Sequence, residues 1–279
     1  MTTTFSWRRA SPREPRCTYD VIPLSGGRVA LVVGDVVGRG LHAAATMGRL
    51  RTAVRAFADI DLMPDELLTH LDDVVIRLQR EESREDGEIS ATCLYAIYDP
   101  ATRLCSLASA GHVPPALATS AAGTRTTGAA PAEAQEAGTA ADLPALPIGP
   151  PPGLGGLPFE TAQWELPEGS LLALYTDGLV QSRTRDLDAS LTLLSGTLAE
   201  TSRSSASPDE VCERLLATML PERTSDDVAL LVARTRALDP GHVATPDLPS
   251  DPAAVSGARR WGTRHGREGK TIWAEQALP

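Results

Sequence analysis

Paired strands interrupted by long amphipathic helices restrict this sequence to a few folds. Two apolar runs, at 19–24 and 28–34, flank the turn SGG at 25–27 and predict a hairpin. Helices are predicted next at 41–58 and 64–80, where apolar residues recur with close to a helical period. Later strands are predicted at 91–98, 104–110, 159–166, 170–175 and 228–232, with another helix at 208–220. Because strict βαβ alternation is absent, this order predicts an α+β fold of layered, mainly antiparallel sheets.

The charge and hydropathy of the chain exclude several classes of protein. Acidic residues outnumber basic ones by 36 to 26, which gives a formal net charge of −10. A general nucleic-acid-binding protein needs a basic surface, and an acidic protein is repelled by an anionic membrane, so we expect neither as a partner. The longest aliphatic run, 29–33, is far too short to span a bilayer, and residues 1–15 contain no apolar segment typical of a secretory signal.

The cysteines indicate a reducing compartment. They are scattered along the chain and form no CxxC pair: Cys17, Cys93, Cys105 and Cys212. This pattern argues against a thiolate zinc site and against a disulfide framework. Reduced cysteines are typical of a cytoplasmic protein, so we expect a cytoplasmic location.

Three segments differ in composition from the rest of the chain. Residues 1–18 show no clear period and are predicted to form an irregular head. Residues 119–158 are predicted to be a variable loop, because 119–147 are rich in Ala, Gly, Thr and Pro. Residues 237–279 form a tail with a basic stretch at 259–270. We interpret that stretch as a solvated tail, with contact to an acidic partner or nucleic acid as the alternative.

Acidic residues stand at the ends of three predicted strands. Asp35 follows one apolar strand and lies in the glycine-rich segment GDVVGRG, and Asp177 follows another in the segment YTDG. Asp226 and Asp227 directly precede the strand at 228–232. Each position taken alone is typical of a turn. Considered jointly, the three positions indicate more, because strand ends can converge in an antiparallel sheet. Carboxylates that converge repel one another unless a cation or protons compensate their charge.

Such a cluster is suited to metal-assisted chemistry. Mg²⁺ and Mn²⁺ favour carboxylate, carbonyl and water oxygens as ligands. Two such ions close together can activate a bridging water and clamp a phosphoryl group, so the pattern permits hydrolysis of a phosphate ester. A nucleotide site is the weaker alternative, because GDVVGRG lacks the lysine of a phosphate loop and does not match GxGxxG.

Four segments in this order carry a family resemblance: VGDVVGRG at 33–40, AGHVPP at 110–115, LYTDGL at 174–179 and DDVALLV at 226–232. Together they closely resemble the sporulation stage II protein E class of metal-dependent Ser/Thr phosphatases, which belongs to the type 2C (PPM) superfamily. The resemblance covers a domain at about 19–236. It implies a four-layer αββα sandwich with a two-metal centre between the sheets.

The resemblance also implies roles for particular residues. Asp35 would bridge two Mn²⁺ or Mg²⁺ ions, and Val36 would offer its backbone carbonyl to the metal site. Asp177 would ligate one metal, with Asp226 as the next ligand and Asp227 as the runner-up. Asp35 and Asp177 would thus carry the catalysis, in which a metal-bridging water attacks the phosphorus atom. The implied substrate is a phosphoserine or phosphothreonine on a regulatory protein such as an anti-sigma-factor antagonist.

The chain departs from the family pattern in two places. Cys17 stands where relatives usually have an acidic residue that supports the metal site, and a thiol is a poor ligand for Mg²⁺ or Mn²⁺. An alternative function is therefore a catalytically impaired, phosphatase-like protein that binds a partner without turnover. The tail at 237–279 resembles the truncated start of the kinase-like ATPase domain that often follows in actinobacterial relatives.

Three further polar or aromatic residues have structural interpretations. His112 follows a glycine and precedes a valine and two prolines, so we expect it to order the turn after a hairpin strand. The alternative for His112 is a general acid. Tyr175 and Trp164 are expected to pack in the core or against the sheet.

Overall fold

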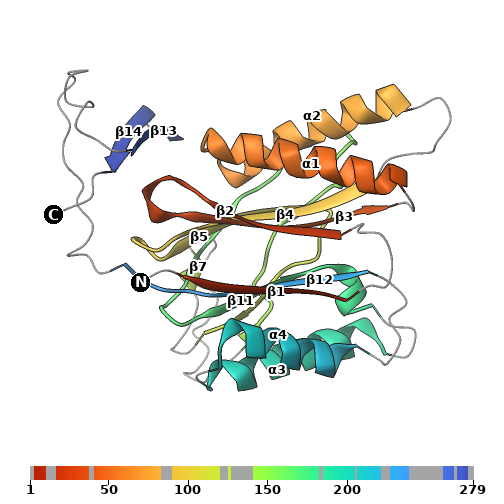
Figure 1. The fold of residues 1–279 in the computed structure, drawn as a ribbon, viewed down its shortest axis with the longest axis vertical. Helices are drawn as coiled ribbons and strands as arrows, with labels where there is room; N and C mark the ends of the chain where they lie inside the picture. The colour runs from red at the N-terminus through yellow and green to blue at the C-terminus, as the bar shows by residue number, and fades with distance from the viewer. Residues whose placement is uncertain are drawn as a thin grey trace.

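The computed structural model describes residues 3–10, 17–37, 41–82, 90–119, 125–126, 141–181, 185–204, 206–220, 227–238, 260–266 and 269–275. Two mainly antiparallel sheets lie face to face, and a pair of helices covers the outer face of each (Figure 1). The predicted α+β class and the αββα layering are therefore confirmed.

The first sheet contains the hairpins that the sequence predicts. Its strand order is β2-β3-β4-β5-β10-β7, and β9 pairs in parallel with β5. The strands are β2 (Cys17–Pro23), β3 (Val29–Val37), β4 (Ser90–Asp99), β5 (Leu104–Ala110), β7 (Arg125–Thr126), β9 (Ile148–Gly149) and β10 (Ala162–Glu165). The short 3-10 turn η1 (Ser25–Gly27) joins β2 to β3.

The second sheet has the order β1-β12-β11-β6-β8. Its strands are β1 (Thr4–Ala10), β6 (Ala116–Ala118), β8 (Ala141–Asp142), β11 (Leu171–Tyr175) and β12 (Val228–Arg234). The chain passes from the first sheet to the second between β5 and β6, through residues 111–115. The predicted variable loop at 119–158 contributes the short strands β7, β8 and β9, and much of the rest of it lies outside the described residues.

The prediction of an irregular head over residues 1–18 is wrong for the described part. Residues Thr4–Ala10 form the edge strand β1, antiparallel to β12, and Cys17 already begins β2. Ser6 is buried against helix α4 (Pro208–Met219), while the half-exposed Trp7 stacks on Tyr19 of the first sheet with ring centroids 4.5 Å apart. The polar residues of this edge strand find partners on α4, which is why its sequence lacks a continuous apolar run.

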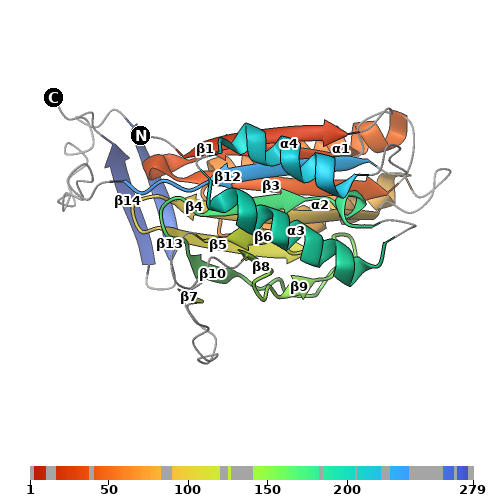
Figure 2. The same ribbon diagram turned by 90° about the horizontal axis from the view of Figure 1, so that it is seen from below.

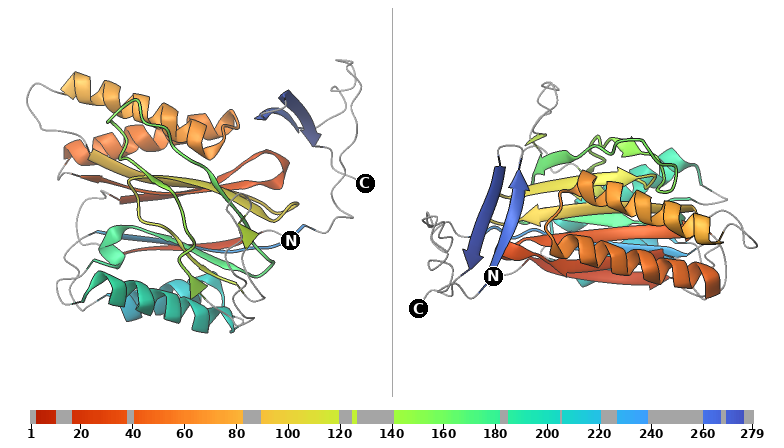
Figure 3. Two further views of the ribbon diagram at one scale, coloured as in Figure 1. Left: turned by 180° about the vertical axis from the view of Figure 1, so that it is seen from behind. Right: turned by 90° about the horizontal axis from the view of Figure 1, so that it is seen from above.

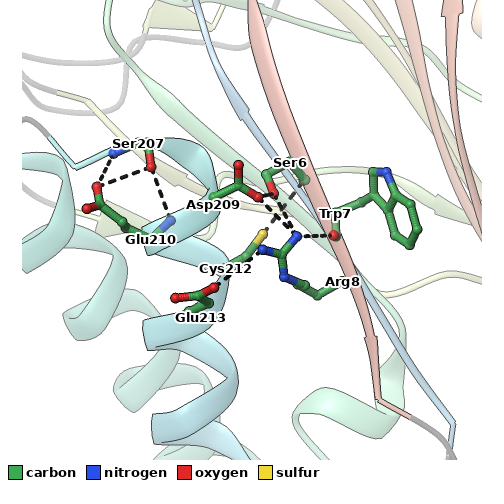
Figure 4. A network of polar contacts seen from close by, with 8 residues as sticks. All are labelled: Ser6, Trp7, Arg8, Ser207, Asp209, Glu210, Cys212 and Glu213. Carbon is green, nitrogen blue, oxygen red and sulfur yellow. Dashed lines mark hydrogen bonds and ion pairs between the residues drawn. The ribbon is translucent and has the colours of Figure 1, made fainter.

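Contacts between β1 and α4 are drawn in Figure 4. The Ser6 hydroxyl donates to the carboxylate of Asp209, and Arg8 Nη1 lies 3.0 Å from Asp209 Oδ1. Helix α4 begins with a capping box in which Ser207 and Glu210 exchange hydrogen bonds between side chain and backbone. Because the ion pair is solvent-exposed, we expect the cap and the burial of β1 to contribute more to stability than the charges.

Four helices complete the layers. Helices α1 (Leu41–Asp59) and α2 (Pro64–Glu82) cover the first sheet, and α3 (Leu187–Ser202) and α4 (Pro208–Met219) cover the second, as the views from below and above show (Figures 2 and 3). One apolar core lies under each helix pair and a third lies between the sheets. No described helix has both the length and the apolar character that crossing a bilayer requires.

The core holds the predicted aromatic residues and all four cysteines. Trp164 packs between the sheets and Tyr175 packs under α3 and α4, as expected. All four cysteines belong to the described residues, are buried, and form no disulfide. Burial raises the pKa of the Cys93 and Cys105 thiols to about 12, so both stay protonated at neutral pH.

The described part of the tail forms a small separate sheet. Strands β13 (Arg260–Gly266) and β14 (Gly269–Glu275) pair as an antiparallel hairpin. The likeness of 237–279 to the start of a kinase-like ATPase domain stays a prediction.

Candidate functional site

Asp35 lies near the end of β3, on the face turned toward the second sheet. Leu31 and Val33 pack in the core between the sheets, and alternation along the strand directs Asp35 to the same side. Its Oδ1 accepts a hydrogen bond of 2.8 Å from the backbone N–H of Val36. Asp35 is half-buried, so the residue keeps some contact with solvent.

Two residues flank Asp35 across the strands on either side. Cys17 on β2 and Thr92 on β4 are its directly opposite partners in the two antiparallel ladders. Opposite residues in such ladders share a face, so the thiol and the hydroxyl lie beside the Asp35 carboxylate. Cys17 is fully buried. Gly34 permits the close approach of β4, since a Cβ there would lie 2.6 Å from the carbonyl oxygen of Thr92.

Asp177 begins the short 3-10 helix η2 (Asp177–Leu179) directly after β11. Its carbonyl accepts hydrogen bonds from the N–H groups of Val180, at 2.9 Å, and Gln181, at 2.8 Å. Its carboxylate Oδ2 accepts from Gln181 Nε2 at 3.1 Å. The tight turn thus fixes the backbone from which the half-buried carboxylate projects.

Asp227 lies beside this turn, directly before β12. Thr176 Oγ1 donates to the carbonyl of Asp227, at 3.4 Å, and accepts from the N–H of Ala229, at 3.0 Å. The Asp227 residue is buried, with 4% of its surface exposed. Asp226, the preferred ligand in the sequence analysis, lies outside the described residues, as do residues 38–40 of the glycine-rich segment.

His112 joins the two sheets at this end of the sandwich. Its Nδ1 lies 2.8 Å from Thr92 Oγ1 on the first sheet, and its Nε2 lies 3.0 Å from the carbonyl oxygen of Tyr175 on the second. The end of β4 that faces Asp35 therefore lies against the end of β11 that leads into Asp177. The convergence of the Asp35 and Asp177 carboxylates themselves stays a prediction.

Both ring nitrogens of His112 are occupied by these contacts, and the residue is 3% exposed. The turn is ordered by the Ser109 side chain rather than by the imidazole, because the Ser109 hydroxyl accepts from the His112 N–H and donates to the His112 carbonyl. A general acid needs a proton that can reach the leaving group. The structure gives His112 no such proton, since the one N–H of a neutral ring is used by the Tyr175 carbonyl.

Burial lowers the pKa of His112 to about 4, although the Tyr175 carbonyl opposes the shift. The unfolded chain binds a proton near pH 6.5, and the folded chain does so only near pH 4. We therefore expect the free energy of unfolding to fall as the pH is lowered from 6.5 towards 4, by up to about 1.4 kcal/mol per pH unit. Above pH 6.5 this group should not affect the free energy of unfolding. Urea unfolding of the wild type and His112→Gln at pH 7 and pH 5 measures this. Equal pH dependence in both proteins would contradict it.

The described residues that the family resemblance implies as metal ligands offer hard oxygen atoms. They are the carboxylates of Asp35 and Asp177, on opposite sheets, and the backbone carbonyl of Val36. This chemistry fits Mg²⁺ or Mn²⁺ better than a soft metal. Within the described ranges, no three His, Cys, Asp or Glu side chains form a group that could hold a metal ion by themselves. A complete ligand set would therefore need Asp226, water or substrate oxygens.

The sequence patterns single out neither Thr92 nor the link through His112. Thr92 lies opposite Asp35 through the pairing of β3 with β4, and because helices α1 and α2 separate these strands in the chain, no turn sets their register. The contact of His112 with Tyr175 joins residues that lie 63 positions apart and on different sheets, and no local pattern indicates it.

A family model described as "Stage II sporulation protein E (SpoIIE)" matches residues 25–236. The chain belongs to the SpoIIE family. The match covers the whole sandwich from the β2–β3 turn onward, including Asp35, Val36, Asp177 and both candidate residues at 226–227.

Solved structures resemble this SpoIIE-family chain over most of its length. The RsbU and RsbW domains of a Mycobacterium tuberculosis protein are 29% identical to it, with a TM-score of 0.67, covering 86% of this chain and 63% of that one. RsbX in complex with magnesium is 15% identical, with a TM-score of 0.56, covering 83% and 94%. The PP2C phosphatase domain of SpoIIE from Bacillus subtilis, solved with a fragment of the regulatory domain, is 15% identical, with a TM-score of 0.55, covering 84% of this chain and 63% of that one.

These comparisons establish a PP2C-type phosphatase fold for the chain. The two more distant structures show the shared fold alone. The chain spans less than two thirds of the length of the Mycobacterium tuberculosis protein.

Proposed function

We propose that this SpoIIE-family chain is a Mn²⁺- or Mg²⁺-dependent phosphatase that hydrolyses phosphoserine or phosphothreonine on a regulatory protein. The observation that carries the proposal is that His112 links Thr92, the strand partner of Asp35, to Tyr175, two residues before Asp177, in a PP2C-type sandwich. Asp35 comes from the first sheet and Asp177 from the second. The magnesium complex of RsbX supports the choice of a hard divalent ion.

Asp35, the Val36 carbonyl, Asp177 and Asp226 would hold the metal ions, with Asp227 as the runner-up to Asp226. When bound, such ions activate water and neutralise the charge that builds up on a phosphoryl group. The protein supplies one carboxylate from strand β3 and one from the hydrogen-bonded turn after β11, so their positions do not have to be ordered when substrate binds. This mechanism needs no nucleophilic cysteine or serine, consistent with a core in which the Cys93 and Cys105 thiols stay protonated.

The proposed substrate is a phosphorylated regulatory protein such as an anti-sigma-factor antagonist. Support comes from the similar Mycobacterium tuberculosis structure, which contains an RsbU domain together with an RsbW domain. The proposed location is the cytoplasm, where such a regulator would be found. Nucleic acid and membranes remain unexpected as partners, given the acidic balance of the chain.

The second candidate is an impaired phosphatase-like protein that binds a partner without turnover. The observation that favours it is Cys17, buried directly opposite Asp35 where relatives have an acidic residue. The loss of a carboxylate beside Asp35 would weaken binding of a hard cation, because a thiol is a soft donor.

One assay separates the two candidates. The full chain is incubated with a phosphoserine peptide and Mn²⁺, and phosphate release is compared before and after chelation with EDTA. We expect metal-dependent release in the wild type, and a further gain in Cys17→Asp but not in the matched control Cys17→Ser. Folded wild-type protein that releases no phosphate, together with active Cys17→Asp, would establish the impaired candidate instead.

A further inference from the structure

His112 occupies the point where the chain crosses from one sheet to the other. It follows β5 of the first sheet and precedes β6 of the second. Its ring reaches back to Thr92 on β4 and across to the backbone of β11. A buried side chain with a polar contact on each sheet acts as a tie between the two layers.

The two contacts determine which nitrogen carries the proton. The Tyr175 carbonyl can only accept a hydrogen bond, so Nε2 must be the donor. Because the lowered pKa keeps the ring neutral, Nδ1 has no proton and accepts from the Thr92 hydroxyl. The order of donors is thus Thr92 Oγ1–H to Nδ1, then Nε2–H to the Tyr175 oxygen. With the proton on Nδ1 instead, Nε2 and the Tyr175 carbonyl oxygen would be two acceptors facing each other.

The crossover itself fixes the orientation of the ring. Ser109 bonds both the N–H and the carbonyl of His112. Gly111 has a φ of +64°, and its N–H donates to the Gly149 carbonyl at 2.8 Å. A Cβ on Gly111 would lie 2.8 Å from the Pro151 side chain, so the turn is closely packed on that side as well. The imidazole therefore has little freedom to rotate away from its partners.

Each end of the tie is a neighbour of a proposed metal ligand, either across a strand pair or along the sequence. Thr92 is directly opposite Asp35 across the β3–β4 ladder, on the same face. Tyr175 is two residues before Asp177, and the intervening Thr176 is bonded to the strand that follows Asp227. A change in the separation of Thr92 and Tyr175 would be carried to the separation of the two carboxylates, because both are on short rigid elements.

We propose that His112 is a positioning residue that sets the separation of Asp35 and Asp177 and so tunes the affinity of the site for its metal. This inference rests on the proposed function. It assigns His112 no contact with substrate and no proton transfer. Partners that orient metal ligands typically contribute 10- to 100-fold to metal affinity.

Two pairs of variants test the tie at both ends. Asn at position 112 offers polar atoms only near the place of Nδ1, whereas Gln can put an amide N–H near the place of Nε2 and bond the Tyr175 carbonyl. Thr92→Val removes the donor hydroxyl with little change of shape, and Thr92→Ser retains it. We expect His112→Asn and Thr92→Val to bind Mn²⁺ about 10- to 100-fold more weakly in calorimetric titration. We expect His112→Gln, which keeps the Tyr175 contact but loses the one with Thr92, to weaken binding as well, and the matched control Thr92→Ser to remain closer to the wild type.

A metal-free measurement accompanies the titration. Backbone amides of Val180 and Gln181 donate to Asp177, so their hydrogen exchange reports on the turn that holds this carboxylate. We expect about tenfold faster exchange at these two amides in Thr92→Val, with exchange in α4 unchanged. A purely structural role would speed exchange throughout the second sheet and its helices.

The outcomes distinguish this inference from the proposed function. Wild-type protein that binds no Mn²⁺ contradicts the proposed function, while the exchange measurement still decides the role of His112. Wild type that binds Mn²⁺, with equal affinity and equal Val180 and Gln181 exchange in folded Thr92→Val and Thr92→Ser, overturns the role of His112 alone.

Discussion

Asp35→Asn is expected to lower Mn²⁺-dependent phosphate release by more than about 100-fold, since replacing residues that only support metal ligands already costs 10- to 100-fold. Asparagine has the same shape and keeps an oxygen that can accept the hydrogen bond from the Val36 N–H. What it lacks is the negative charge that a hard cation requires. The half-buried position of Asp35 means that the fold should tolerate the neutral amide.

The measurement is the initial rate of phosphate release from a phosphoserine peptide over a range of Mn²⁺ concentrations. Asp177→Asn should give a loss of the same order, because the proposal places it as a ligand from the other sheet. Asp73→Asn, which removes an exposed acid from α2, is the matched control and should leave the rate unchanged. Similar rates in Asp35→Asn and Asp73→Asn would rule Asp35 out as a metal ligand.

Arg28→Met is expected to lower the free energy of unfolding by about 3–5 kcal/mol. Arg28 Nη2 lies 2.6 Å from Asp61 Oδ1, and both side chains are at least nine-tenths buried. The same guanidinium donates to the carbonyl and the hydroxyl of Ser25. It thereby joins the β2–β3 turn to the connection between α1 and α2. Removing it leaves the Asp61 carboxylate buried without its counter-charge.

Thermal unfolding followed by circular dichroism measures this loss, which should lower Tm by on the order of 10 °C. The exposed pair of Arg103 and Glu165 provides the control: Arg103→Met should cost no more than about 1 kcal/mol. The double variant Arg28→Met with Asp61→Asn should recover part of the stability, because the unpaired charge is removed. A Tm for Arg28→Met within a degree or two of that for Arg103→Met would contradict the account.

Most of the framework could be predicted from the sequence because its signals are local. The apolar runs on either side of the turn at 25–27 indicate β2 and β3, and Pro64 followed by two acids marks the start of α2. Strand β1 was missed since its polar residues are bonded to a helix that follows some 200 positions later. Helix α3 was missed because it buries hydroxyl side chains: Ser190, Thr197, Thr201 and Ser202.

The candidate site also has some features that the sequence predicts and others that it does not. Asp35 and Asp177 stand out in the sequence because each ends an apolar strand, and the family resemblance adds their roles. The place of Cys17 beside Asp35 follows from the register of one predicted hairpin. The tie from Thr92 through His112 to Tyr175 depends on how two sheets stack, and side chains far apart in the sequence determine that stacking.

Anomalous diffraction at the manganese edge, from crystals of the full chain grown with Mn²⁺, would locate the metal itself. We expect anomalous density in contact with the carboxylates of both Asp35 and Asp177. Crystals of folded protein in saturating Mn²⁺ that show no density between these two carboxylates would contradict this expectation.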